Sequence, residues 1–337
     1  MSTLTVAAWK RSLINLSYHT QASIQLLFEE SLKLKRNFLQ FGLSAGQYHS
    51  GYKGTAALLF FEPSTRTRFS FEAAASRAGF HPLILDGGIG TSLEKGETIE
   101  DTILNIEALR PLFFVVRCHD LVDLQSLSES LSVPVINAGW GRKGHPTQAL
   151  LDALTIYEKL GDLRERRVLF VGDVKHSRVV SSHLELSQLM GYQVGMSCPQ
   201  EFRPNDQSAQ GEKNRNCPYF SNLNEGLEWA DVVIALRVQK ERHDNENLFL
   251  IEDYREHFGL NAERVQKHLK SAGLIMHPGP INYGVEIESD LLKDQRCLIL
   301  KQVENGAFLR EGIIRLMFDQ SQSTHQVEPT IRRNLNE

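Results

Sequence analysis

Short apolar runs alternate with stretches of helical periodicity along most of the chain. Residues 56–61 form an uninterrupted apolar run, which is typical of a buried strand. Residues 98–109 instead repeat isoleucine and leucine near a helical period, and residues 67–78 are rich in Phe and Ala. Strands that alternate with helices predict parallel sheets covered by helices on both faces. The other segments expected as strands are 82–85, 112–116, 133–136, 168–171, 194–197, 232–236 and 274–276.

A long helix is expected over residues 147–160, with Pro146 suited to its first turn. The strand and helix pattern then starts again. We therefore predict an α/β protein with two doubly wound parallel-sheet domains, hinged near this helix. Polar residues 199–218 are expected to form a surface loop, and residues 319–337 a loosely held tail. The further helices are expected over 177–190, 225–229, 262–271 and 303–317.

Composition narrows the class of protein. A length of 337 residues suggests two domains, at roughly 150 residues per domain. The net charge of −4 gives no bulk signal for nucleic-acid binding. The four cysteines form no CxxC pair, which favours free thiols in a reducing compartment. The first residues lack the apolar core of a signal peptide, and no run reaches about 18 apolar residues. We expect a cytoplasmic protein without membrane contact.

The turn between the strand at 56–61 and the next helix carries the most informative chemistry. Free N–H groups at a helix start favour an anion, and Ser64, Thr65 and Thr67 add hydroxyl donors. The guanidinium of Arg66 matches phosphate oxygens in a bidentate way. Arg68 lies about 200° around the helix from Arg66, so we assign it to an ion pair with an acid of this segment. The residues alone also allow an ordinary capped helix with solvated arginines. The acids considered for Arg68 are Glu62 and Glu72.

The run from residue 60 to residue 72, FFEPSTRTRFSFE, is similar to the carbamoyl phosphate signature of the aspartate/ornithine carbamoyltransferase family. The resemblance extends from about Ile14 to about Leu316. It implies that the turn at Ser64 to Thr67 binds carbamoyl phosphate together with Arg117. It further implies that His145 donates to the carbamoyl oxygen and that Gln148 holds the carbamoyl amide. His145 precedes an expected helix start, which suits an anion.

The same resemblance implies a shared active site. In the family, a serine and a lysine of the glycine-rich loop reach the active site of the neighbouring subunit. Ser92 and Lys95, in the loop at 87–96, match these residues. We therefore expect a homotrimer, in which Lys95 also contributes to catalysis and to aspartate binding. Whether this trimer stands alone, pairs with regulatory chains or assembles with dihydroorotase is left open by the sequence.

The second half of the chain carries the residues expected to choose the acceptor. Arg178 and Arg237 match family positions that grip L-aspartate, and Gln239 supports them. Arginine holds carboxylates at fixed angles. Ornithine enzymes carry an HCLP motif near the end of the second domain, whereas residues 277–280 here are HPGP, without a cysteine. One family arginine nearby is replaced by Tyr283. The resemblance thus implies the aspartate branch.

We expect transfer of the carbamoyl group from carbamoyl phosphate to the amine of L-aspartate, giving N-carbamoyl-L-aspartate and phosphate in pyrimidine biosynthesis. Catalysis is assigned to Arg66, Thr67, His145 and Lys95, with no metal or organic cofactor. The resemblance implies a C-terminal helix that returns to the first domain. The donor domain is thus expected over 1–146 plus 302–337, and the aspartate domain over 147–301.

Three alternatives were weighed against this interpretation. A different acceptor such as ornithine is disfavoured by the HPGP segment. A catalytically silent family member that serves as a structural partner is expected to lack phosphate-site residues, which this chain keeps. Dinucleotide binding at the turn after residue 171 is disfavoured because Gly172 stands alone, without the GxGxxG pattern.

Overall fold

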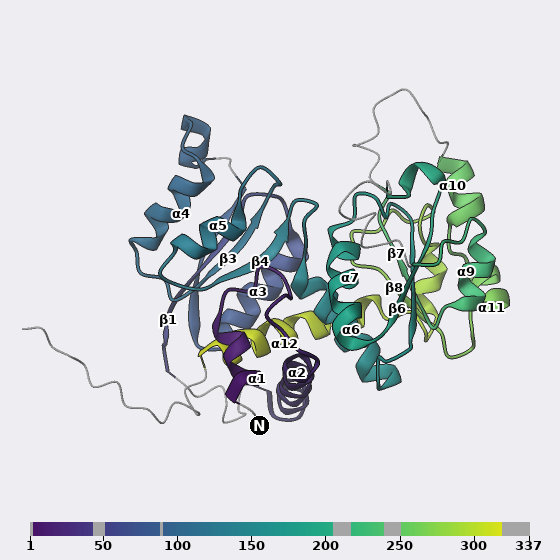
Figure 1. Cartoon of the computed structure of the whole chain (residues 1–337), viewed down its shortest axis with the longest axis horizontal. Helices are drawn as coiled ribbons and strands as arrows, with labels where there is room; N and C mark the ends of the chain where they lie inside the picture. The colour runs from purple at the N-terminus through teal and green to yellow at the C-terminus, as the bar shows by residue number, and fades with distance from the viewer. Residues whose placement is uncertain (1–2, 43–50, 88–89, 205–216, 239–250, 319–337) are drawn as a thin grey trace, which may run out of the picture.

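The computed structural model describes residues 3–42, 51–87, 90–204, 217–238 and 251–318 of the chain. Gln239, residues 205–216 of the expected loop and the tail at 319–337 lie outside these ranges. Figure 1 shows two lobes, each built on a twisted sheet, with α6 (Pro146–Leu160) and α12 (Ile299–Phe318) between them. In the described ranges, every helix is too short or too polar to cross a membrane.

The first sheet is parallel, in the order β2-β1-β3-β4. Residues of β1 alternate between two cores, as the pleat of a strand requires. Leu58 and Phe60 face the core shared with α2, α3 and α12, while Ala57 and Leu59 face the core shared with α4 and α5. The first sheet is therefore covered on both faces. Its elements are β1 (Gly54–Phe60), α3 (Thr65–Arg77), β2 (Phe80–Asp86), α4 (Ile99–Glu107), β3 (Phe114–Cys118), α5 (Leu124–Ser130) and β4 (Val135–Trp140).

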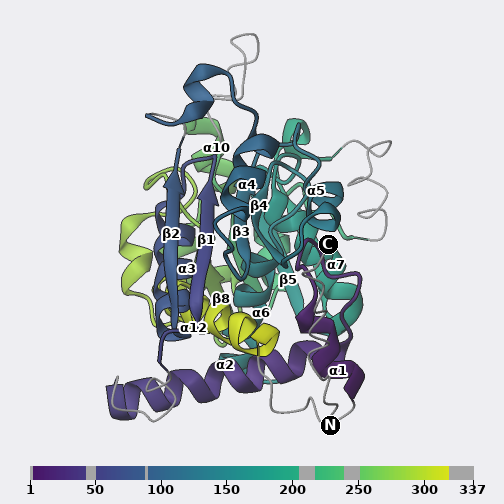
Figure 2. The same cartoon turned by 90° about the vertical axis from the view of Figure 1, so that its left-hand side faces the viewer.

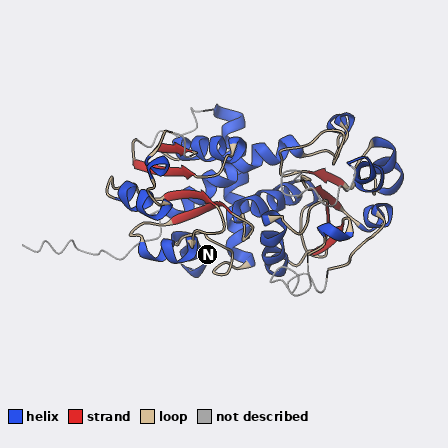
Figure 3. Cartoon of the chain, turned by 90° about the horizontal axis from the view of Figure 1, so that it is seen from above, coloured by secondary structure: helices blue, strands red, loops and turns tan. Residues whose placement is uncertain are grey.

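The second sheet repeats this arrangement, in the order β6-β5-β7-β8 and parallel throughout. Seen from above, the strands of the two sheets form separate groups with helices around each (Figure 3). The expected architecture of two parallel-sheet domains is thus confirmed. The elements of the second lobe are β5 (Arg167–Val171), α7 (Arg178–Met190), β6 (Gln193–Ser197), α9 (Leu223–Trp229), β7 (Val232–Ala235), α10 (Ile251–Phe258), α11 (Ala262–His268) and β8 (Leu274–Met276).

The C-terminal helix α12 returns to the first lobe, as expected, and packs on α2 (Gln21–Phe41), α3 and α6. Figure 2 shows α12 lying across α2, below the first sheet. Buried ion pairs support this contact. Nε of Arg77 lies 2.7 Å from Oε2 of Glu311, and Nζ of Lys35 lies 2.7 Å from Oε1 of Glu158 and 3.0 Å from Oε2 of Glu304.

The sequence analysis did not predict α1 (Thr3–Ala7), α2, α5 or α10. Its expected strands agree with the observed ones to within four residues at each end. The largest difference at a helix start is at α12, which begins at Ile299 instead of residue 303. α3 also begins two residues early, at Thr65, because Ser64 occupies the N-cap position.

Candidate active site

The carboxyl ends of β1 and β3 and the start of α3 form the donor side of the candidate site. Ser64 has extended backbone angles (φ −162°) at the N-cap, and its side chain makes no capping hydrogen bond. The first-turn N–H groups of a helix have no intrahelical acceptor. They are therefore oriented to bind an anion together with the side chains of Thr65, Arg66 and Thr67. The helix start expected from the sequence is therefore present, although the Ser64 hydroxyl itself does not cap it.

Arg66 reaches from the first lobe to a turn of the second. A Cβ atom built on Gly279 would lie 2.6 Å from Cζ of Arg66, so a larger residue here would push the guanidinium away from this turn. Gly279 has a φ of +68°, its peptide bond to Pro280 is cis, and its N–H donates to Nδ1 of His277 at 2.7 Å. Partial burial lowers the pKa of Arg66. The candidate site therefore lies between the two lobes.

A carboxylate and two arginines connect the lobes beside Arg66. Nη1 of Arg178 donates to Oε2 of Glu62 at 2.9 Å, and Nε of Arg117 lies 3.6 Å from the same oxygen. A Cβ atom on Gly139 would lie 3.1 Å and 3.3 Å from Nη1 of Arg117 and of Arg178, so glycine leaves room for both side chains. Burial, followed by the nearby charge of Arg178, lowers the pKa of Arg117 to about 9. The single negative charge of Glu62 offsets only one of the two positive charges, so the cluster keeps a net positive charge.

The prediction that Arg68 pairs with Glu62 or Glu72 is wrong. Nε of Arg68 lies 3.2 Å from Oδ2 of Asp86, at the end of the neighbouring strand β2, and the guanidinium lies over the ring of Phe69. Glu62 turns instead toward Arg178. Sequence proximity suggested Glu62 or Glu72, whereas the parallel pairing of β1 with β2 brings Asp86 close to Arg68.

His145 and Gln148 lie at the start of α6. Pro146 occupies the first turn as expected, and the backbone N–H of His145 donates to Oγ of Ser182 at 2.8 Å. Nδ1 of His145 is buried and has no partner among the described residues. Burial, with the nearby charges of Arg178 and Arg117, lowers the pKa of His145 well below its usual value. His145 is therefore neutral and can offer one N–H to a ligand.

Arg310 belongs to this region but was not singled out from the sequence. It lies on α12, fully within the protein, where Nη1 donates to Oγ of Ser70 at 2.8 Å and Nη2 to Oγ1 of Thr147 at 3.5 Å. Burial lowers the pKa of Arg310 to about 10, so it remains a cation at neutral pH. The one available signal was an arginine on the apolar face of the helix expected at 303–317.

The acceptor side is the carboxyl edge of the second sheet. Val171 of β5 pairs with Ala235 of β7, so the turn leading to Arg178 adjoins the segment that carries Arg237. Glu286 fixes this segment, because its Oε1 accepts the N–H of Val238 at 2.7 Å. Glu286 also accepts from the backbone and the side chain of Asn282, both at 2.7 Å. Arg237 therefore stands on a braced segment, and Glu286 is a second residue that the sequence analysis missed.

Ser92 and Lys95 are exposed on a short 3-10 helix, Ser92–Lys95, that precedes α4. α4 lies on the outer side of the first lobe, away from the second lobe (Figure 1). The structure thus does not bring these two residues to the arginine cluster of their own chain.

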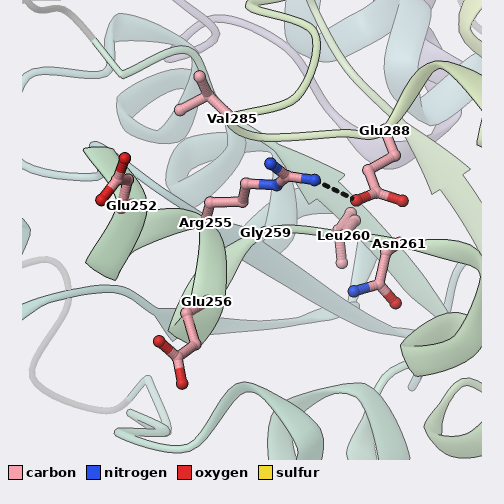
Figure 4. Close-up of a pocket in the computed structure, with 8 residues that line it drawn as sticks. All are labelled: Glu252, Arg255, Glu256, Gly259, Leu260, Asn261, Val285 and Glu288. Atoms are coloured by element: carbon pink, nitrogen blue, oxygen red, sulfur yellow. Dashed lines mark hydrogen bonds and ion pairs between the residues drawn. The ribbon is translucent and has the colours of Figure 1, made fainter. Parts of the chain in front are cut away.

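A cavity of about 460 Å³ lies elsewhere, on the second lobe (Figure 4). Three glutamates and one arginine line it, and Nη2 of that arginine, Arg255, already lies 3.0 Å from Oε1 of Glu288. Such a lining disfavours anionic substrates. The lining residues are Glu252, Arg255, Glu256, Gly259, Leu260, Asn261, Val285 and Glu288.

Comparison with known families agrees with this geometry. Residues 11–158 match the profile described as aspartate/ornithine carbamoyltransferase, carbamoyl-P binding domain, and residues 164–317 match its Asp/Orn binding domain. The chain belongs to the aspartate/ornithine carbamoyltransferase family. The first match contains the donor side of the site, and the second contains Arg178 and Arg237.

Solved structures of this family resemble the chain over nearly its whole length. Aspartate transcarbamoylase from Trypanosoma cruzi in complex with N-(phosphonacetyl)-L-aspartic acid is 26% identical, with a TM-score of 0.78 over 94% of this chain and 98% of that chain. The same enzyme in complex with carbamoyl phosphate is 26% identical, with a TM-score of 0.78 over 93% of this chain and 97% of that chain. Ornithine carbamoyltransferase from Thermus thermophilus is 27% identical, with a TM-score of 0.73 over 90% and 97%. Both branches of the family thus match at similar sequence identity, and identity does not separate them.

Proposed function

We propose that this carbamoyltransferase uses L-aspartate as its acceptor and forms N-carbamoyl-L-aspartate, a step of pyrimidine biosynthesis. The observation that carries the proposal is the second cationic group at the acceptor edge. Arg178 and the braced Arg237 offer two guanidiniums to a substrate with two carboxylates. The turn at residues 277–280 offers no thiol to a side-chain amine.

In this proposal carbamoyl phosphate binds first, on the donor side. Its phosphate is held by the first turn of α3 and by Arg117, and the positive cluster favours this dianion. Neutral His145 donates an N–H to the carbamoyl oxygen, and Gln148 holds the carbamoyl amide. The phosphate residues are Ser64, Thr65, Arg66, Thr67 and Arg117, with Ser92 and Lys95 supplied by a neighbouring subunit of a homotrimer.

Aspartate then binds Arg178 and Arg237, with Gln239 as a supporting residue. Its neutral amine attacks the carbamoyl carbon, and a C–N bond forms as the C–O bond to phosphate breaks. Arg66, Thr67 and His145 stabilise the oxyanion that develops. The departing phosphate accepts the amine proton. The reaction then depends on positioning and electrostatics, which can supply on the order of 7–11 kcal/mol from positioning alone.

The domain assignment is part of the proposal. Residues 1–146 with 302–337 form the donor domain and 147–301 the aspartate domain, so that α6 and α12 connect the two substrate sites. Contacts of α12 with α2, α3 and α6 support this division. A catalytically silent homologue is disfavoured, because the arginines, hydroxyls and His145 of the donor side are all retained.

The test is carbamoyl product formation by the purified chain, with L-aspartate and L-ornithine assayed in parallel. We expect turnover with aspartate and none with ornithine. Turnover with ornithine would overturn the roles of Arg178 and Arg237 as an aspartate clamp. Mixing Arg66→Ala chains with Lys95→Ala chains tests the shared site, because only subunits that exchange residues can restore activity. Two inactive variants that stay inactive after mixing would contradict the trimer.

A further inference from the structure

A fully buried carboxylate lies directly behind Gln148. Asp152 stands one turn further along α6, and its Oδ1 accepts hydrogen bonds from Nε2 of Gln148 at 2.9 Å and from Nε2 of Gln302 at 2.7 Å. Its Oδ2 lies 3.2 Å from Nε2 of His183. A buried charge is costly unless it is paired and hydrogen-bonded. The three donors meet this need, but they do not explain why an acid is placed here.

The chemistry of the carboxylate fixes the orientation of the Gln148 amide. An ionised aspartate only accepts hydrogen bonds, so the NH₂ group of Gln148 must face Asp152. The amide oxygen of Gln148 is then turned away from Asp152, toward the start of α6. His145 lies three residues earlier and therefore on the same face of the helix. The oxygen is thus presented as an acceptor on the side of the candidate site.

We propose that Asp152 is a positioning residue that holds the amide of Gln148 with its oxygen toward the carbamoyl N–H₂ group of the donor substrate. This inference rests on the proposed role of Gln148. It names the feature by which the site distinguishes a carbamoyl group from an acyl group of the same shape. Without Asp152, the Gln148 amide can rotate, and its NH₂ group would then face the NH₂ group of the carbamoyl donor.

The same carboxylate also reaches the turn that covers Arg66. Gln302 donates to Asp152 and accepts the backbone N–H of His277 at 2.9 Å through its Oε1. His277 in turn accepts the N–H of Gly279. Asp152 therefore supports two parts of the site through two different partners, which allows them to be separated by mutation.

His183 shows which substitution should preserve the function. Its Nε2 must donate to the carboxylate, and its Nδ1 lies 2.8 Å from the hydroxyl of Tyr192. In Asp152→Asn, the amide oxygen can still accept from Gln148, while the new NH₂ group faces His183. The imidazole can accept this hydrogen bond as the tautomer with its proton on Nδ1. In that tautomer Nδ1–H donates to the Tyr192 oxygen, while the Tyr192 hydroxyl donates to the carbonyl of His183. Asn should therefore rescue what Ala loses.

The experiment is calorimetric titration of the full chain with two stable probes, phosphonoacetamide and phosphonoacetone, which differ only in NH₂ against CH₃. The readout is the ratio of the two Kd values. A general loss of structure weakens both probes and leaves the ratio unchanged. We expect the wild-type protein to prefer the amide and Asp152→Ala to lose about 3- to 10-fold of this preference, the range for one hydrogen bond. Adding Asp152→Ala to Gln148→Ala should have no further effect on the ratio.

Matched variants complete the test. Asp152→Asn and Gln302→Leu should keep the ratio within about twofold, because the Gln148 amide keeps an acceptor in both. An unchanged ratio in Asp152→Ala, or an equal loss in Gln302→Leu, would overturn the proposal. If Asp152→Ala is not folded by circular dichroism, Asp152→Ser, with a side chain too short to reach Gln148, takes its place. A wild-type protein without preference would overturn the role of Gln148 as well, whereas a wrong acceptor would appear only in the turnover assay.

Discussion

The donor and acceptor sides of the site are built in different ways. The donor side comes mainly from one contiguous turn, residues 62–67, and is completed by Arg117 and by the start of α6. The acceptor side is assembled from three separate segments, which carry Arg178, Arg237 and Asn282. Glu286 holds the last two together through hydrogen bonds to Val238 and Asn282. A contiguous anion cradle is set by local backbone geometry. A dispersed clamp depends on tertiary contacts, so the two sides should respond differently to mutation.

The largest expected effect is on the donor side. Arg66→Ala removes the guanidinium to which the proposed mechanism assigns stabilisation of the oxyanion, and kcat should fall by about 10²- to 10³-fold. Arg66 is open to solvent on one side, so the fold should remain intact by circular dichroism. Arg68→Ala is the matched control, since Arg68 lies on the same helix as Arg66 but pairs with Asp86 of β2. Near-normal turnover in Arg66→Ala would sink the mechanism.

Arg237→Ala tests whether the acceptor side is independent of the donor side. Loss of a charge-assisted hydrogen bond should lower kcat/KM for aspartate by about 10- to 100-fold. The Kd of phosphonoacetamide should stay the same, because the donor side is formed without Arg237. Arg255→Ala, in the cavity of Figure 4, is a control in the same lobe. Weaker binding of phosphonoacetamide in Arg237→Ala would show that the two sides form one unit.

The same contrast explains what the sequence could predict. The parallel sheets and the helix start at Ser64 to Thr67 follow from local patterns, such as an apolar strand that ends in polar residues, whereas Arg117 and His145 were singled out by the family resemblance. Arg310, Asp152 and Glu286 were missed, because their roles arise from contacts between distant segments. Arg310, for example, contacts Ser70, which is 240 residues away in the chain. No local pattern records such a contact.

The missed helices have local reasons. α2 is capped by reciprocal hydrogen bonds between Thr20 and Ser23, in which serine stands where a capping box usually carries Glu or Gln. α5 has seven residues, too few for a clear helical period. The wrong partner for Arg68 has a different cause. Strand pairing brought Asp86 close to it, and pairing cannot be derived from the spacing of charges.

The buried His277 predicts how the free energy of unfolding depends on pH. Burial lowers the pKa of His277 to about 3, and the unfolded value is about 6.5, so the unfolded chain binds more protons below pH 6.5. Stability is thus full above about pH 6.5 and falls toward pH 3, by about 2 kcal/mol at pH 5 for one histidine. His277→Asn should remove this contribution to the change of unfolding free energy with pH, measured by urea unfolding between pH 5 and 7.5. His257→Asn, on the surface of α10, should leave the slope nearly unchanged.

Glu62→Gln tests the connection between the two sides. Glu62 accepts from Arg178 and lies close to Arg117, so its neutral amide leaves two guanidiniums facing each other. We expect about a 10-fold lower kcat/KM for aspartate, the low end for charge-assisted hydrogen bonds. Asp86→Asn, at the end of the adjacent strand, is the control. Equal losses in both variants would mean that general charge, not the bridge, is responsible.

The smallest expected effect comes from Tyr283, which the resemblance noted in the sequence implies has replaced an arginine. Tyr283 is 55% exposed and lies near Arg66, at the edge of the candidate site. Tyr283→Arg adds a cation that attracts both anionic substrates, but exposed charges are screened by salt. KM for aspartate should fall by about two- to threefold at low ionic strength, and the gain should disappear above about 0.3 M salt. Tyr283→Phe should leave KM unchanged under both conditions. A gain that persists at high salt would indicate a direct contact with the substrate, and Tyr283 would then belong to the acceptor side itself.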